Sequence, residues 1–312
     1  MVLACLVPTV WFVQRGRYRT KCELLTEETR KRVGMTDTEL IGPEWLRRLL
    51  GSTRFQDVVG VSVPARGDDE FLQVYVSPIP TLRKVWVGGR RVTDEGATHL
   101  AELRGLEELI LTGTSLTDEG LARLAGLTEL RRLHLDHTGV TDAGLESLAA
   151  FARLETLSLA NTQVSGAGLE HLETLDRLTS LSLANAPLRD PAPAHLAMLT
   201  SLEDLSLEGA SVNDDALAAI AKLANLKKLR LGGTQITDDG LARLSALGKL
   251  EVLDLRRTAV TDAGLVEIGK LPALGYLWAE GTSVSAEALE EFSEAHPAVW
   301  IDGKQGPKGS EE

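Results

Sequence analysis

The residues most capable of chemistry form a recurring pair of a hydroxyl and an acidic residue. It is found at Thr93-Asp94, Thr117-Asp118, Thr141-Asp142, Thr237-Asp238 and Thr261-Asp262. A row of paired carboxylates could perform acid–base chemistry. The same pair is also a helix N-cap, with a negative charge at the positive end of the helix dipole. Because each pair precedes an apolar stretch that needs a helix start, we interpret the pairs as structural.

A second candidate is the set His134, Asp136 and Ser158, which supplies the residue types of a serine hydrolase triad. A triad also needs a base oriented by a buried carboxylate and an oxyanion hole, and residues on an open sheet do not provide these. Metal binding by His134, Asp136 and His137 is disfavoured because neighbouring strand residues face opposite sides. We therefore expect no catalytic residues, no metal, no cofactor and no enzymatic activity.

These residues are positioned by a repeat with the pattern L-x-x-L-x-L-x-x-T-x-L-T-D-x-G-L-x-x-L-x-x-L and a period of 24 residues. Nine copies follow one another without insertion or deletion, beginning at Leu82, Leu106, Leu130, Leu154, Leu178, Leu202, Leu226, Leu250 and Leu274. Positions 4 and 6 alternate as in a short strand, and positions 16, 19 and 22 form the apolar side of a helix. A lone repeat buries too little to fold, so stacked neighbours must share one core.

Other positions of the repeat predict specific structural roles. Position 9 is threonine in six repeats, and its hydroxyl should bond backbone groups that the turn would otherwise leave unpaired. Position 15 is always glycine or alanine, which allows close approach of helix and strand. In the fifth repeat, Pro187, Pro191 and Pro193 should replace the first helical turn with an extended segment. The fold class is thus α/β, a right-handed solenoid (horseshoe) with a parallel sheet on its concave face and short helices on its convex face.

Composition limits the partners. The net charge of −12 argues against a nucleic-acid partner, which would need a basic surface. Both cysteines, Cys5 and Cys22, precede the repeats and form no zinc or disulfide framework.

The chain divides into four parts. Residues 1–21 are an apolar N-terminal segment with a basic flank, and 22–57 form a helical linker and a cap that includes the helix 43–50. Residues 58–302 are the repeat domain, with a degenerate repeat at 58–81, nine repeats at 82–297 and a cap at 298–302; residues 303–312 form a disordered tail. The apolar run 2–13 is shorter than a spanning helix of roughly 20 residues and contains Pro8. It fits a membrane anchor truncated at its start, or an interfacial or buried N-terminal segment. An anchor would hold the repeat domain in the cytoplasm on a membrane, because of the basic flank; without an anchor, the protein would be cytoplasmic.

Any specificity must lie in the variable strand positions 3, 5 and 7. Aromatic, arginine and large apolar side chains are the usual anchors of interfaces. We therefore predict that a protein partner contacts Trp86, Ile110, Arg132, His134, Arg230, Tyr276 and Trp278. The alternative is that these residues are solvated, or that the tryptophans pack on the terminal caps. We expect a monomer.

The T-D-x-G-L core resembles the ribonuclease-inhibitor-like superfamily of leucine-rich repeats, and is most similar to short bacterial repeats of 24 residues. This resemblance covers residues 82–297 and implies a non-catalytic scaffold that binds protein on its concave face. The pattern also looks like the repeats of F-box ubiquitin-ligase adaptors, and Pro43-Glu44-Trp45-Leu46 is similar to the opening of an F-box. The short stretch before Val58 leaves no room for a complete F-box, so an adaptor is the second interpretation. An enzyme with a repeat-built groove is a third, without a motif to support it.

Overall fold

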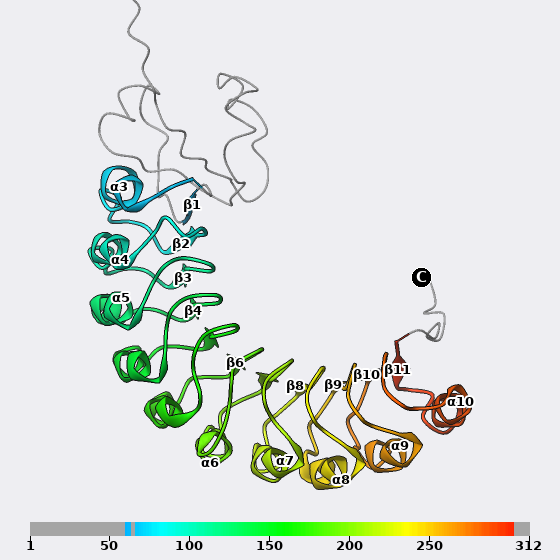
Figure 1. Cartoon of the computed structure of the whole chain (residues 1–312). Coiled ribbons are helices and arrows are strands. Elements are labelled where there is room, and N and C mark those ends of the chain that lie inside the picture. Colours follow the sequence, from blue (N-terminus) through cyan, green and yellow to red (C-terminus); the bar gives the residue numbers. More distant parts are fainter. Residues whose placement is uncertain (1–59, 64–65, 303–312) are drawn as a thin grey trace, which may run out of the picture. The chain divides into compact units, whose positions relative to one another are not determined.

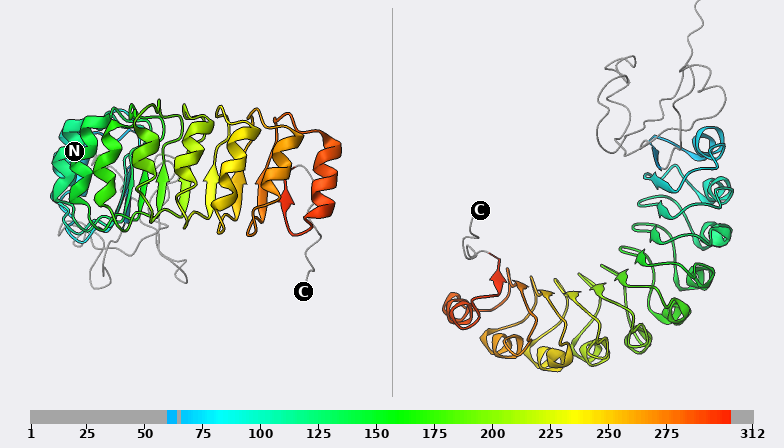
Figure 2. Two further views of the ribbon diagram at one scale, coloured as in Figure 1. Left: turned by 90° about the horizontal axis from the view of Figure 1, so that it is seen from below. Right: turned by 180° about the vertical axis from the view of Figure 1, so that it is seen from behind.

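The computed structural model describes residues 60–63 and 66–302, which fall into two compact units meeting at Gly139 and Val140. The cap helix 43–50, the segment 2–13 and the tail 303–312 lie outside the described residues. Each unit is a row of parallel strands with a row of helices on its other side (Figure 1). In the second unit the helices stand side by side and the strands line the inner, concave side (Figure 2).

The first unit contains four strands. They are β1 (Gly60–Val63), β2 (Lys84–Val87), β3 (Glu108–Ile110) and β4 (Arg132–His134). Its helical segments are α3 (Asp69–Phe71), η1 (a π-helical turn, Leu72–Val76), α4 (Asp94–Leu100), α5 (Asp118–Arg123) and η2 (a 3-10 turn, Leu124–Gly126). Strand β1 pairs with β2 from Gly60 opposite Lys84, one period of 24 residues apart.

The second unit contains seven strands in sequence order. They are β5 (Thr156–Ser158), β6 (Ser180–Ser182), β7 (Asp204–Ser206), β8 (Lys228–Arg230), β9 (Val252–Asp254), β10 (Tyr276–Trp278) and β11 (Trp300–Ile301). Its α-helices are α6 (Ala192–Leu196), α7 (Asp214–Ile220), α8 (Asp238–Leu241), α9 (Asp262–Ile268) and α10 (Ala286–Ala295). The segments η3 (Asp142–Ala150), η4 (Ala167–Thr174) and η5 (Ala242–Ala246) are 3-10 helices. The predicted α/β solenoid is therefore confirmed, although two repeats use 3-10 in place of α-helices.

Stacked leucines form the core. In the repeat that begins at Leu106, seven leucines are fully buried: Leu106, Leu109, Leu111, Leu116, Leu121, Leu124 and Leu127. The threonines of position 9 close the turn as predicted, because each Oγ1 donates to the carbonyl oxygen three residues earlier. These bonds are 2.5–2.8 Å long and join Thr114 to Leu111, Thr138 to Leu135, Thr162 to Leu159, Thr234 to Leu231, Thr258 to Leu255 and Thr282 to Ala279.

Four threonines of position 12 accept a hydrogen bond from a backbone N–H of their own helix, namely Thr93, Thr117, Thr141 and Thr261, whereas Thr237 does not. The aspartates that follow make other contacts. Asp94 accepts hydrogen bonds from the backbone N–H and the Oγ1 of Thr117 in the next repeat, at 2.8 and 2.6 Å. We call this forward contact the carboxylate clamp. Within the units it recurs from Asp142 to Ser165, Asp214 to Thr237, Asp238 to Thr261 and Asp262 to Ser285, and in shifted form from Asp69 to Thr93.

The clamp also explains the small residue at position 15. A Cβ on Gly120 would lie 2.2 Å from Oδ1 of Asp94, and one on Gly240 would lie 2.3 Å from Oδ1 of Asp214. Glycine at these two positions makes room for the carboxylate of the preceding repeat, whereas the sequence suggested a helix–strand contact. Gly168 instead lies against the backbone of Asp142, and Ala288 occupies this position beside the clamp from Asp262 to Ser285.

The fifth repeat departs from this scheme. Gly166 occupies the aspartate position of the repeat before it, so no carboxylate is available there. Asp190 forms a cis peptide bond with Pro191, and helix α6 begins only at Ala192, two positions later in its repeat than α4. The late start of the helix agrees with the prediction, but the segment before it is a turn at Asp190 and Pro191 and is not extended, and Pro193 lies inside the helix.

Candidate functional site on the strand faces

The side chains of strand positions 3 and 5 lie on the open face of each unit. In the first unit the paired rows are Lys84, Glu108 and Arg132 at position 3, and Trp86, Ile110 and His134 at position 5. The second unit has longer rows, with Arg230, Asp254 and Trp278 adjacent at position 5 of β8, β9 and β10. We describe the two faces separately.

Glu108 organises the face of the first unit. Its Oε1 accepts a hydrogen bond of 2.8 Å from Nε1 of Trp86 on β2. Its Oε2 lies 3.2 Å from Nε of Arg132 on β4 and 3.5 Å from Nζ of Lys84. The carboxylate is only 13% exposed, whereas the side chains of Lys84 and Arg132 are 38% and 50% exposed. The largely buried carboxylate of Glu108 thus contacts Trp86, Lys84 and Arg132, so that it links three neighbouring strands.

The electrostatics of Glu108 agree with this arrangement. Burial alone would raise the pKa of Glu108, but the hydrogen bond from Trp86 and the charges of Arg132 and Lys84 outweigh burial. Together they hold the pKa of Glu108 below its ordinary value, so the carboxylate is ionised at neutral pH.

The other predicted residues of this face are Ile110 and His134, both half-buried. Nδ1 of His134 lies 3.7 Å from Oδ2 of Asp136, which is too long for a hydrogen bond. Asp136 also accepts a long bond of 3.4 Å from Thr112. Ser158, the third residue type of the triad, belongs to the second unit.

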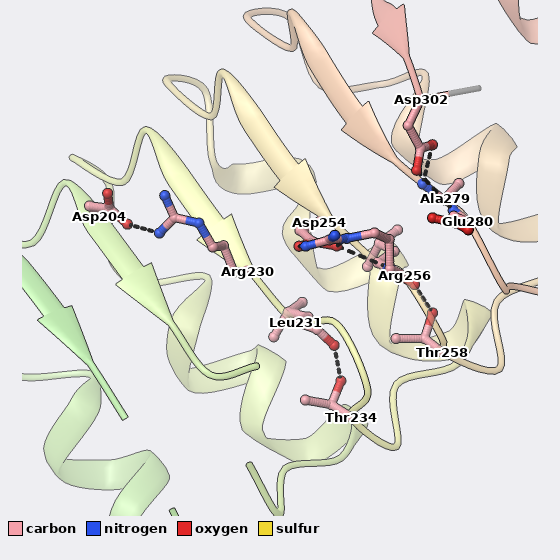
Figure 3. Close-up of polar contacts among 11 residues, drawn as sticks. Asp204, Arg230, Leu231, Thr234, Asp254, Arg256, Thr258, Ala279, Glu280 and Asp302 are labelled. Carbon is pink, nitrogen blue, oxygen red and sulfur yellow. Dashed lines mark hydrogen bonds and ion pairs between the residues drawn. The ribbon is translucent and has the colours of Figure 1, made fainter. Parts of the chain in front are cut away.

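In the second unit, Arg230 and Asp204 form an ion pair across β8 and β7, with Nη1 of Arg230 2.7 Å from Oδ1 of Asp204 (Figure 3). Both side chains are partly exposed, at 34% and 26%. The predicted contact residue Arg230 is therefore oriented by its neighbour and is not a freely rotating side chain.

The strongest cluster of this unit is built around Asp254, which is fully buried although it occupies a face position. Nε and Nη2 of Arg256 donate to the Asp254 carboxylate at 2.9 and 2.6 Å, and the backbone N–H of Arg256 donates at 3.0 Å (Figure 3). The hydrogen bond with Asp254 raises the pKa of the Arg256 guanidinium, although burial opposes this. The guanidinium carbon lies 6.0 Å from the ring centroid of Trp278, at the limit of a cation–π contact.

Sequence reasoning missed Arg256 and Asp254. It treated each face position as independent, but Arg256 at position 7 bends back to position 5 of its own strand. The two consecutive arginines, Arg256 and Arg257, next to an acidic strand residue were the available signal.

Tyr276 is 51% exposed, and its ring lies 6.2 Å from the ring of Trp300 on β11. Tyr276 and Trp278 thus lie on β10, next to the last strand. The ring of Tyr276 packs on the C-terminal end of the array although the side chain is half exposed. Asp302 accepts the backbone N–H groups of Ala279 and Glu280 beyond β10 (Figure 3).

The serines of β5, β6 and β7 give the rest of this face a small, polar character. Ser158 and Ser206 are buried and Ser182 is half-buried. Among the described residues, no group of three or more His, Cys, Asp and Glu side chains could hold a metal ion. Within the same residues, none of the helices has the length and apolar character needed to cross a membrane.

Comparisons with known proteins agree with this fold. A family model described as "Leucine Rich repeat" matches residues 104–125, 127–149, 222–245 and 249–269. A comparison with curated protein sequences finds no match. A chain of the mouse RP105/MD-1 complex aligns with a TM-score of 0.54 at 17% identity, covering 74% of this chain and 44% of that one.

The Arabidopsis receptor kinase HAESA, in complex with the peptide hormone IDA and the co-receptor SERK1, aligns with a TM-score of 0.53 at 18% identity. The alignment covers 75% of this chain and 40% of HAESA. The chain therefore spans less than half the length of either protein, and at these identities the likeness concerns the fold alone. The family match, the register of 24 residues and the stacked strands show that this protein is built of leucine-rich repeats.

Proposed function

We propose that the protein is a non-catalytic interaction scaffold that binds a protein partner on the strand faces of its repeats. Leucine-rich repeat domains typically bind proteins or peptides, and HAESA, which shares the fold, is bound to a peptide hormone. The observation that carries the proposal is that carboxylates of the faces hold several of the aromatic and arginine side chains in place: Glu108 holds Trp86 and Arg132, and Asp204 holds Arg230. A side chain that is already fixed loses less conformational entropy on binding, which favours a role as an interface anchor.

The anchors in this proposal are Trp86, Ile110, Arg132 and His134 in the first unit, and Arg230, Tyr276 and Trp278 in the second. Arg256 joins them, because its guanidinium is fixed by Asp254 next to Trp278. We further propose that the repeats are of the ribonuclease-inhibitor-like, 24-residue type, which the constant register supports, and that the protein is a monomer.

The test is crosslinking to the partner in cell lysate, followed by identification of the linked protein. The variants Arg230→Glu and Trp278→Ala should lose the crosslinked species. The controls Arg123→Glu and Arg243→Glu change helix-side residues that pair with Glu119 and Asp215, and should retain it. Loss in the helix-side variants with retention in the strand-face variants would overturn the proposal. Urea melts of all four variants establish that each is folded.

Membrane association through residues 2–13, with the repeats in the cytoplasm, is a separate proposal that rests on the sequence alone. Deleting residues 2–13 should move the protein from the membrane fraction to the soluble fraction. An unchanged distribution would contradict an anchor.

A further inference from the structure

The strand face of the first unit differs from the protein as a whole in the charge that it presents. The chain carries a net charge of −12. On this face, however, the outermost charged groups are the cations Lys84 and Arg132, while the carboxylates of Glu108 and Asp136 are only 13% and 17% exposed. A partner approaching the sheet therefore meets positive charge first.

The two cations converge on one oxygen of Glu108. Lys84 and Arg132 lie two strands apart in one row, with Glu108 between them, so their backbones are roughly 10 Å apart. Nζ of Lys84 and Nε of Arg132, however, lie 3.5 and 3.2 Å from the same Oε2 of Glu108, which places these two nitrogens within about 7 Å of each other. The contact between Arg132 and Glu108 uses Nε, which leaves both Nη groups without a partner in the described part of the chain.

An apolar row lies beside the cations. Trp86 and Ile110 pair across β2 and β3, two residues further along the strands than Lys84 and Glu108. The Nε1 of Trp86 is already bonded to Glu108, so its ring is fixed on the sheet with its polar atom satisfied. Gly88 follows shortly after Trp86 and has no side chain. A Cβ there would be in ordinary van der Waals contact, 3.7 Å from the carbonyl oxygen of Thr112. The surface thus combines two neighbouring cations with a fixed apolar row beside them.

We propose that this surface binds an acidic, amphipathic segment of a protein partner, in which two neighbouring carboxylates lie beside apolar side chains. The carboxylates pair with Lys84 and Arg132, and the apolar side chains pack on Trp86 and Ile110. A helix with glutamates at positions i and i+4 fits, because four residues at 1.5 Å each span about 6 Å on one face. Leucines at i+3 and i+7 then lie on the same face. The inference rests on the proposed function of the strand face and specifies its partner chemistry.

The probe is a labelled, alanine-rich helical peptide with this arrangement of two glutamates and two leucines. Matched peptides carry glutamine or lysine in place of both glutamates, or carry the glutamates seven residues apart. Binding to the full chain is measured by fluorescence anisotropy. Its location is followed by the ¹⁵N–¹H signal of the Trp86 indole, assigned from its absence in Trp86→Phe.

We expect the glutamate peptide to bind most tightly and to shift the Trp86 indole signal. The double variant Lys84→Gln/Arg132→Gln should weaken binding about tenfold and reduce its salt dependence, since each exposed ion pair contributes roughly a two- to fivefold change in affinity. The control Arg104→Gln/Arg123→Gln changes the net charge equally, at residues that bond Gly126 and Glu119 away from this face, and should leave binding unchanged.

Four outcomes would overturn the inference. Equal binding of the glutamine peptide would exclude charge recognition, but would leave the proposed function intact if binding is still lost in Trp86→Ala. Equal weakening by the two double variants would show that binding depends on the net charge of the whole protein and not on the cations of this face. Tighter binding of a single-stranded oligonucleotide through Lys84 and Arg132 would identify a nucleic-acid surface instead. Failure of every peptide would reject the acidic partner, and the crosslinking test would still decide the proposed function.

Discussion

The carboxylate clamp makes a quantitative prediction for Asp94 and Gly120. Asp94 accepts two hydrogen bonds from Thr117. Hydrogen bonds to charged groups contribute roughly 1.5–3 kcal/mol each, but this site is exposed, so about 1 kcal/mol each is appropriate. Asp94→Ala should therefore destabilise the fold by about 2 kcal/mol.

Gly120→Ala should disturb the same contact between Asp94 and Thr117, because Gly120 lies beside the Asp94 carboxylate. Alanine in a helix is about 1 kcal/mol more favourable than glycine. However, the new Cβ would lie 2.2 Å from Oδ1 of Asp94, so the carboxylate must withdraw and both of its bonds to Thr117 are lost. The net effect of Gly120→Ala should be a loss of about 1 kcal/mol, opposite in sign to the helix propensity alone.

The double variant separates the clamp from other effects. Once Asp94 is alanine, the clash with the carboxylate is absent, and only the contact with Leu116 opposes the gain in helix propensity. Apart from that contact, which both variants carrying Gly120→Ala share, the double variant should be about 1 kcal/mol less stable than the wild type, whereas independent effects would give about 3 kcal/mol, a coupling of about 2 kcal/mol. The new Cβ also comes within 2.5 Å of Cδ1 of Leu116, but this contact is present in both backgrounds and cancels in the cycle.

The assay is urea denaturation followed by far-ultraviolet circular dichroism for all four proteins. Gly248→Ala is the control, because a Cβ there meets nothing within 4 Å, and its effect should stay within about 0.5 kcal/mol. Additive effects of Asp94→Ala and Gly120→Ala, or a Gly120→Ala protein more stable than the wild type, would refute the clamp.

Three further predictions concern single sites. The pKa of Glu108 is lowered in the folded protein, so its stabilising contribution is complete above the unfolded value near 4.5 and is lost as the pH falls through the folded pKa. In Glu108→Gln, the unfolding free energy should therefore fall less steeply as the pH is lowered into the acid range. An unchanged pH dependence would contradict this. Arg256→Ala leaves the buried Asp254 with only a backbone donor, and should lower the unfolding free energy in urea by about 2–4 kcal/mol; an effect below about 0.5 kcal/mol would show that the carboxylate is otherwise satisfied. Arg257 has φ of +58°, so Arg257→Gly should raise the midpoint of thermal unfolding, whereas Gly233→Ala, at φ of +69°, should lower it.

Much of the fold could be predicted because its determinants are local or exactly periodic. The leucines, the strand register and the threonine bonds at Thr114 and its equivalents depend on spacing alone, and the structure confirms them. The role of Asp94 was not predictable in the same way. Its N-cap interpretation already accounted for the residue type, while its real partner lies 23 residues ahead, at Thr117.

A left-handed residue at position 8 was also missed. Its occupants include Gly113, His137, Asn161 and Arg257, all with positive φ. The conformation lets the backbone N–H reach the next strand, as in the bond of 2.7 Å from Gly113 to the carbonyl oxygen of Asp136. Glycine or asparagine in most repeats was the signal, but the histidine and arginine concealed it. The candidate site was predictable only as a set of exposed positions, because the orientation of Arg132 by Glu108 and of Arg256 by Asp254 depends on side-chain contacts that no periodic rule specifies.

The forward direction of the clamp has a consequence for how such a gene can change in length. Within each unit, the donor lies a fixed distance ahead of the acceptor, as from Asp214 to Thr237 and from Asp238 to Thr261. Excision of residues 226–249 would bring Asp214 against Thr261 in the same geometry, and duplication of the segment would add one clamp. Recombination between repeats in register therefore leaves no unmatched carboxylate. Because Gly166 has no carboxylate, an exchange of repeats immediately after it breaks no clamp from that position.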